Sequence, residues 1–288
     1  PVKEAYLSEE EKEAAKIKQG RDKYLSVDER IAIQLKTENK AFNVQKFDHP
    51  YPHCWRTDKP VLYYPLDSWF IKTTAVKDKL IELNNTINWK PESTGTGRFG
   101  NWLENLVDWN LSRSRYWGTP LPIWRAEDGS EELCFGSVEE LTQALAKAID
   151  SGKLTAEQQQ GNEAFIAAAK AGEADLHRPY VDNIFVLSPS GVVMAREADL
   201  IDVWFDSGAM PFAQWHYPFE NQEIFKQSYP ADFISEGVDQ TRGWFFTLHA
   251  ISAMVEESVA FKNVVSTGLV LDKNGNKMSK RLGNAIDP

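Results

Sequence analysis

Residues 231–246, ADFISEGVDQTRGWFF, decide the fold prediction. The apolar run at the start of this stretch is typical of a buried strand, which we expect to end at Gly237. A helix is expected to begin near Asp239, and a helical pattern continues over 241–256. A strand that passes directly into a helix is the building unit of an α/β sheet.

Four side chains of this stretch form a candidate binding site at the strand-to-helix turn. In open α/β sheets ligands bind at the carboxyl edge of the strands, which is where Glu236, Asp239 and Gln240 are predicted to lie. Their carboxylate and amide groups suit ribose hydroxyls and an α-ammonium group. Trp244, one helical turn beyond Gln240, offers an apolar wall. Taken alone, Asp239 is equally explained as a helix N-cap.

Other apolar runs extend the predicted sheet. They cover residues 61–64, 184–187 and 263–271, and they alternate with helical stretches. This alternation favours an α/β sheet with insertions over an all-β fold.

Helix signals fill the first 47 residues. Capping boxes that begin at Ser8 and Ser26 predict two helix starts. Ile31 and Leu35, four residues apart, are predicted to supply a buried stripe on the second helix.

A second helical region, alanine-rich, is expected within residues 126–180. Ser137 and Thr155 each begin a capping pattern, and Gly152 is expected to end the first helix. That helix carries an apolar residue at every fourth position, namely Leu141, Leu145 and Ile149.

The stretch 271–284, LDKNGNKMSKRLGN, is a candidate polyphosphate loop. Asn274-Gly275 favours a tight turn after the strand, because Gly and Asn tolerate positive φ. The polar side chains that follow are Lys277, Ser279, Lys280 and Arg281. Cations on a short glycine-flanked segment can close around a polyphosphate, although a solvated basic turn is the ordinary explanation of such a charge run.

Composition limits the remaining possibilities. The chain has 288 residues, 42% hydrophobic content and a formal net charge of −10, so any RNA contact must be local. Two cysteines cannot form a disulfide framework, and we find no membrane-spanning run, so we expect a cytoplasmic protein. The chain has no initiator Met, and we expect it to be a piece of a longer protein.

A metal site is not expected. His49, His53 and Cys54 lie close in the sequence and hint at metal ligands. A second cysteine three residues on would complete the usual pair, but that position is Thr57. We therefore predict no bound metal.

Residues 277–281 with Gly-Asn at 283–284 resemble the KMSKS signature of class I aminoacyl-tRNA synthetases, with Arg in the last place. The resemblance implies that the loop holds the phosphates of ATP through Ser279, Lys280 and Arg281. It further implies that Lys277 and Lys280 are catalytic, with Lys280 stabilising the pyrophosphate leaving group.

Two more stretches resemble the isoleucine-specific members of this family. Residues 236–245 match the pattern EGxDQxRGWF, and residues 202–208 match DVWFDSG. The first match implies adenylate contacts from Glu236, Gly237, Asp239 and Gln240. Trp204 and Trp244 are implied to line the amino-acid pocket.

Residues 109–120, WNLSRSRYWGTP, are similar to the family pattern WxxSRxRxWGxP. Read physically, Arg113 and Arg115 either pair with acidic groups or face the acceptor end of tRNA. The turn at 118–120 is expected from its Gly and Pro.

The resemblance implies half of a catalytic domain, because the family's HIGH signature is absent from the sequence. The expected segments are the tail of the editing insertion (1–60), a catalytic segment (61–125), an α-rich insertion (126–195) and a Rossmann-like half with the KMSKR loop (196–288). The implied reaction is ATP- and Mg²⁺-dependent activation of isoleucine and its transfer to tRNA(Ile). Half a site also implies no turnover without the remainder of the same polypeptide.

Three alternatives stay open. A valine-specific relative is the nearest, with Trp244 as the discriminating residue. A carbohydrate-active hydrolase would use the ten tryptophans and the pairs Asp202/Asp206 and Glu236/Asp239, but it leaves the basic loop unexplained. A scaffolding module without activity would retain the fold alone.

Overall fold

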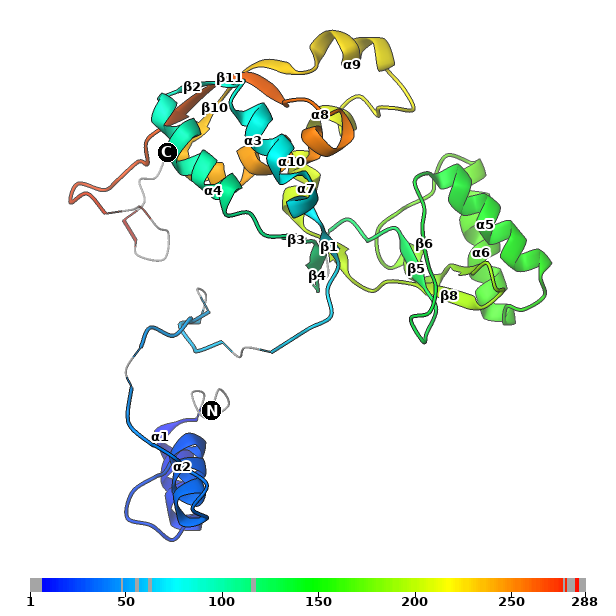
Figure 1. Cartoon of the computed structure of the whole chain (residues 1–288). Helices are drawn as coiled ribbons and strands as arrows, with labels where there is room; N and C mark the ends of the chain where they lie inside the picture. Colours follow the sequence, from blue (N-terminus) through cyan, green and yellow to red (C-terminus); the bar gives the residue numbers. More distant parts are fainter. Residues whose placement is uncertain are drawn as a thin grey trace. The chain divides into compact units, whose positions relative to one another are not determined.

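The computed structural model describes residues 7–47, 49–54, 57–61, 64–114, 118–276, 278 and 283–284. The chain divides into two compact units, Pro1–Asp67 and Ser68–Pro288 (Figure 1). The candidate site residues all belong to the second unit.

The first unit carries helices α1 (Glu9–Lys18) and α2 (Val27–Thr37), and both predicted capping boxes are present. The predicted buried stripe is wrong, because Ile31 and Leu35 are 49% and 38% exposed. Helix α1 is mostly charged, so it offers little apolar surface to receive that stripe. Residues 61–64 were expected to be a strand, and the two of them that are described, Val61 and Tyr64, lie in none.

A three-stranded parallel sheet is the centre of the second unit. Its strands run in the order β10 (Ala231–Gly237), β11 (Phe261–Thr267) and β2 (Asn88–Lys90). Parallel neighbours need a crossover, and helix α10 (Trp244–Val255) supplies it between β10 and β11 (Figure 1). The α/β prediction is confirmed, and β10 ends at Gly237 as expected.

Helix α10 is the middle of the main core. Nine of its twelve residues are buried, and it packs with α3 (Lys77–Asn84) and α4 (Gly100–Glu104). Along the chain, β2 and the π-helical turn η3 (Thr94–Phe99) come between α3 and α4. The largest buried side chains of the cluster include Leu80, Phe99, Leu103, Phe245 and Phe261. Burial of this many aromatic and aliphatic side chains fixes the helix against the sheet.

The helix begins later than the sequence predicts. Residues Val238–Arg242 form a 3₁₀ turn, η5, and α10 starts only at Trp244. The break falls at Gly243, which has an extended φ of −144° that no α-helix residue adopts. A separate turn therefore carries Asp239 and Gln240 between strand and helix.

Short elements surround the amino-terminal part of α10. Strand β1 (Phe70–Ile71) leads into the 3₁₀ turn η2 (Thr73–Val76) and pairs with β3 (Trp109–Asn110), and β4 (Ser112–Arg113) pairs with β9 (Leu200–Ile201). Helices α7 (Val203–Gly208), α8 (Met210–Ala213) and α9 (Gln222–Ser228) follow β9. Their shared core contains Trp109, Leu111, Leu121, Ile201, Phe212, Phe225 and Ile251.

The predicted helices of the insertion are present as α5 (Val138–Asp150) and α6 (Ala156–Lys170). The structure adds an antiparallel sheet of β5 (Ile123–Arg125), β6 (Glu132–Cys134), β7 (Phe185–Leu187) and β8 (Val193–Arg196), in the order β6-β5-β8-β7. The helices lie against this sheet (Figure 1). Between them is a buried cluster that includes Trp124, Leu145, Phe165 and Val186. The region is therefore mixed rather than only helical.

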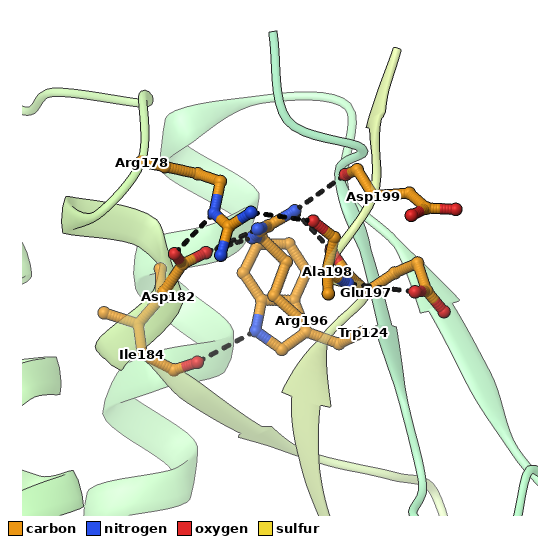
Figure 2. Close-up of polar contacts among 8 residues, drawn as sticks. All are labelled: Trp124, Arg178, Asp182, Ile184, Arg196, Glu197, Ala198 and Asp199. Atoms are coloured by element: carbon orange, nitrogen blue, oxygen red, sulfur yellow. Dashed lines mark hydrogen bonds and ion pairs between the residues drawn. The ribbon is translucent and has the colours of Figure 1, made fainter. Parts of the chain in front are cut away.

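A charged cluster joins the end of this sheet to the chain that leads into β9 (Figure 2). Asp182, in the 3₁₀ turn η4 (Tyr180–Asn183), accepts hydrogen bonds from Arg178 Nε at 2.7 Å and from Arg196 Nε at 3.1 Å. Arg196 Nη1 also donates to the backbone oxygen of Asp199 at 3.2 Å. Partial burial opposes ionisation, but the two guanidinium groups hold the pKa of Asp182 below its ordinary value.

Candidate active site

The carboxyl ends of β10 and β11 form the candidate edge. Glu236 pairs in register with Ser266, and Gly237 pairs with Thr267. Thr267 Oγ1 donates to the backbone oxygen of Glu236 at 3.3 Å, which ties the two strand ends together. Because parallel strands end on the same side, this edge is where an α/β sheet binds ligands.

The η5 turn follows β10 at this edge and holds the Asp239 carboxylate and the Gln240 amide. Asp239 is exposed, and its Oδ1 lies 2.6 Å from where a Cβ on Gly237 would be, so a larger residue at 237 would have to displace this carboxylate. Gln240 Oε1 accepts the backbone N–H of Trp244 at 3.0 Å. Arg98 Nε donates to the buried Thr241 Oγ1 at 2.9 Å, which anchors the turn from the other side.

The two predicted pocket tryptophans come together beside Gln240. Trp244 Nε1, at the start of α10, donates to the backbone oxygen of Ser207 in α7 at 2.9 Å. A Cβ on Gly243 would lie 2.7 Å from Gln240 Oε1 and 3.2 Å from Trp204 Cη2. Trp204 is 40% exposed, whereas Trp244 is partly buried. The arrangement leaves an apolar wall that a ligand can reach.

The DVWFDSG segment is not part of a strand. It forms helix α7, and Asp202 is the N-cap, with its side chain accepting the backbone N–H of Trp204 at 3.3 Å. Strand β9 ends at Ile201, one residue before the cap. The helix turns Trp204 outward, which explains its exposure.

Asp202 is a site residue whose role the sequence reasoning missed. It is only 4% exposed, and its Oδ2 accepts Trp109 Nε1 at 3.0 Å and Arg113 Nη2 at 2.9 Å. The proposed pairing of Arg113 with an acidic group is thus present, while Arg115 lies outside the described residues. An Asp directly before an amphipathic segment was the available signal, because Asp is a preferred N-cap.

A cavity of about 540 Å³ opens beside these groups. It is lined by Arg113, Gly118, Thr119, His177, Ile201, Asp202, Val203, Trp204 and Asp206. Burial raises the pKa of the Asp206 carboxyl, the charge of Asp202 adds to the shift, and the Thr119 hydroxyl opposes it. Since Asp202 is engaged by Trp109 and Arg113, this pair lacks the free acid and base of a glycoside hydrolase.

The turn before the basic loop is described, and the loop's cations are not. Asp272 and Gly275 form the predicted tight turn, with Gly275 at φ +81°. The Asp272 carboxylate accepts Asn284 Nδ2 at 2.9 Å and the backbone N–H groups of Asn274 and Asn276 at 2.8 and 2.9 Å. These hydrogen bonds, that from Asn284 above all, lower the pKa of Asp272. Lys277, Ser279, Lys280 and Arg281 lie outside the described residues.

The described residues also bear on metal sites and membrane spans. Among them, no three or more His, Cys, Asp and Glu side chains are grouped so as to hold a metal ion. None of the helices formed by these residues has the length and apolar character needed to cross a membrane.

Comparisons with known proteins identify the family. The family described as tRNA synthetases class I (I, L, M and V) matches residues 3–288. An isoleucine–tRNA ligase of Cytophaga hutchinsonii is 72% identical over all of this chain and 25% of its own length. One of Bacteroides fragilis is 65% identical over 91% of this chain and 24% of its own length.

A solved structure of methionyl-tRNA synthetase from Mycobacterium tuberculosis, bound by methionyl-adenylate, is 17% identical, with a TM-score of 0.44, over 82% of this chain and 32% of that one. The chain spans about a quarter of the length of the curated relatives it matches. Its match to the family runs almost from end to end. The chain belongs to the class I tRNA synthetases of the isoleucine, leucine, methionine and valine group.

Proposed function

We propose that this chain is part of an isoleucine–tRNA ligase, which activates isoleucine with ATP and transfers it to tRNA(Ile). The observation that carries the proposal is the pair of indoles, Trp204 and Trp244, held beside Gln240 at the carboxyl edge of the sheet. The identity of 72% to an isoleucine–tRNA ligase supports the same substrate.

The amino-acid end of the site would use the indoles. Isoleucine presents a branched aliphatic side chain, which gains most from flat apolar surfaces that exclude water. Glu236, Gly237, Asp239 and Gln240 would contact the adenylate, with carboxylate and amide groups on its ribose hydroxyls and α-ammonium group.

The phosphate end of the site would use the basic loop. Mg²⁺ enters with ATP as part of the substrate complex. A carboxylate oxygen of isoleucine attacks the α-phosphorus, the bond from that phosphorus to the bridging oxygen breaks, and pyrophosphate leaves. Lys277, Lys280 and Arg281 would neutralise the phosphates, and the Ser279 hydroxyl would donate a hydrogen bond to them. Lys277 and Lys280 would act most on the charge that develops on the leaving group. No side chain of this chain need act as a general base, because positioning and charge neutralisation suffice.

The proposal extends to the segments of the chain, its partners and its location. Residues 1–60 would lead out of the editing insertion, 61–125 and 196–288 would belong to the catalytic domain, and 126–195 would be an insertion within it. The remainder of the same polypeptide would complete the site, and the 2′-hydroxyl of the terminal adenosine of tRNA(Ile) would later take the acyl group. We place the enzyme in the cytoplasm.

The test is isoleucine-dependent pyrophosphate exchange by the full-length enzyme. Trp244→Phe removes an indole N–H bonded to a backbone oxygen, and Trp124→Phe removes the matching bond to Ile184 O in the insertion, at 3.0 Å. We expect Trp244→Phe to raise the KM for isoleucine about tenfold, the effect of a small loss of pocket fit, and Trp124→Phe to leave it unchanged. Exchange that requires valine or leucine instead of isoleucine would overturn the proposed substrate.

A further inference from the structure

The carboxylate of Asp202 joins three parts of the chain. Oδ2 accepts Trp109 Nε1 from β3 and Arg113 Nη2 from β4, and Oδ1 accepts the backbone N–H of Trp204 in α7. A carboxylate that is 4% exposed needs such partners, because burying a charge without them is costly. Its three hydrogen bonds all go to neighbours in the fold.

The cap that Asp202 forms sets both walls of the amino-acid pocket. Trp204 lies two residues after Asp202 in the first turn of α7, so the cap fixes the backbone position from which its indole projects. Ser207, at the other end of the same short helix, supplies the oxygen that accepts Trp244 Nε1. A small rotation of α7 would therefore displace Trp204 directly and Trp244 through its hydrogen bond.

Arg113 reaches this carboxylate through strand register. In the β4–β9 pair Arg113 lies opposite Leu200 and Ser112 lies opposite Ile201, which brings the guanidinium to the residue that follows β9. Ser112 Oγ also accepts the backbone N–H of Trp69 at 2.8 Å. The segment 109–113 is thus also anchored outside α7, and it meets α7 at Asp202 and through the packing of Trp109 on Phe205.

We propose that Asp202 is a positioning residue for the amino-acid pocket: its carboxylate, held by Trp109 and Arg113, sets the orientation of α7 and hence the spacing of Trp204 and Trp244. The inference rests on the proposed function. It predicts that the network controls recognition of the amino acid and leaves recognition of ATP unaffected.

The experiment compares Asp202→Asn and Asp182→Asn in the full-length enzyme. Both substitutions neutralise an aspartate that is paired with arginine, but Asp182 lies in the insertion and bonds Arg178 and Arg196 (Figure 2). Three N–H groups bond the Asp202 carboxylate. An asparagine has only one side-chain oxygen, so at least one of these groups would face the NH₂ of the amide instead. We expect Asp202→Asn to raise the KM for isoleucine about tenfold or more, as for a lost buried charge-assisted hydrogen bond, with the KM for ATP changed less than about twofold.

Further variants keep the test decisive if Asp202→Asn fails to fold. Trp109→Phe removes the indole N–H together with part of the ring, keeps the charge of Asp202 and its pairing with Arg113, and should raise the KM for isoleucine in the same direction by about threefold to tenfold, within the range for one hydrogen bond. Asp182→Asn should lower thermal stability without changing either KM. A purely structural role would show as equal loss of kcat and of both substrates' affinities.

Two results would overturn the inference. One is an unchanged KM for isoleucine in both Asp202→Asn and Trp109→Phe, and the other is a parallel rise in the KM for ATP. Failure of the proposed function is distinct, because the unmodified enzyme would then show no isoleucine-dependent exchange.

Discussion

Mild acid should loosen helix α10 through one buried imidazole. His249 is fully buried, its Nε2 is bonded to the backbone oxygen of Leu80 at 2.9 Å, and its ring meets Phe99 edge-on. Burial lowers the pKa of His249 from 6.5 to about 4, although the bond to Leu80 acts in the other direction. The folded protein therefore keeps the imidazole neutral at pH values where the unfolded chain takes up a proton.

The sign and size of the effect follow from this difference. Because the folded pKa is depressed, the contribution of His249 is fully present above pH 6.5 and is lost as the pH falls toward about 4. At about 1.4 kcal/mol per pKa unit, the loss between pH 7 and pH 5 is about 2 kcal/mol. That corresponds to about a 30-fold change in an opening equilibrium.

Hydrogen exchange of residues 244–255 at pH 7 and pH 5 measures this directly, after correction for the intrinsic pH dependence of exchange. A local measure is needed because the unfolding of a multidomain chain is not a single two-state transition. The other four histidines are exposed, so His216→Gln serves as the control and should behave as the unmodified protein.

In His249→Gln the side-chain amide can still bond the backbone oxygen of Leu80, but it does not titrate between pH 5 and pH 7. Its protection should be nearly the same at both pH values. An equal fall in protection in His249→Gln and in the unmodified enzyme would show that another group carries the pH dependence.

Other expected outcomes concern the site itself. Gly208→Ala places a Cβ 2.8 Å from the backbone of Thr247 in α10, so it should cost about 1–3 kcal/mol and lower the Tm, whereas Gly97→Ala, with open space around it, should not. Asp272→Ala removes the acceptor that joins Asn284 to the turn, and in exchange assays it should slow activation without raising the KM for isoleucine. Lys280→Ala should cut the single-turnover activation rate far more than ATP affinity, and equal losses would refute its role at the leaving group. The chain of 288 residues alone should show no pyrophosphate exchange, and measurable turnover would contradict the half-site assignment.

Strand β10 and its edge residues were predictable because their signals are local. The run that ends at a glycine correctly specified a strand and its last residue, and Gln240 and Trp244 follow three and seven residues later. The expected burial is wrong, because β10 is an edge strand with no buried residue. Their meeting with Trp204 depends on α7 packing against α10, which no pattern within either segment encodes. Only the resemblance to a family placed the two indoles in one pocket.

Helix α7 and the sheet of the insertion show where local patterns fail. A six-residue helix rich in apolar side chains has too few turns to display a helical period, so it resembles a strand. The apolar run 184–187 did indicate β7, but not that it joins a separate sheet. Strands β5, β6 and β8 have three or four residues each and leave little alternation to detect. The bond between Asp202 and Arg113 spans 89 residues of chain and rests on the β4–β9 register. The roles of Lys277, Ser279, Lys280 and Arg281 stay predictions.

Helix α10 has almost no solvent-facing side, and this bears on how amino-acid preference could be redesigned. A side chain surrounded on every side tolerates few changes of volume, so most substitutions between Phe245 and Ala253 would damage the fold before they altered selectivity. On α7, by contrast, Val203 is 64% exposed and Trp204 is 40% exposed. Directed evolution for a different aliphatic substrate should therefore yield viable libraries on the short helix, with the long one kept as an invariant frame.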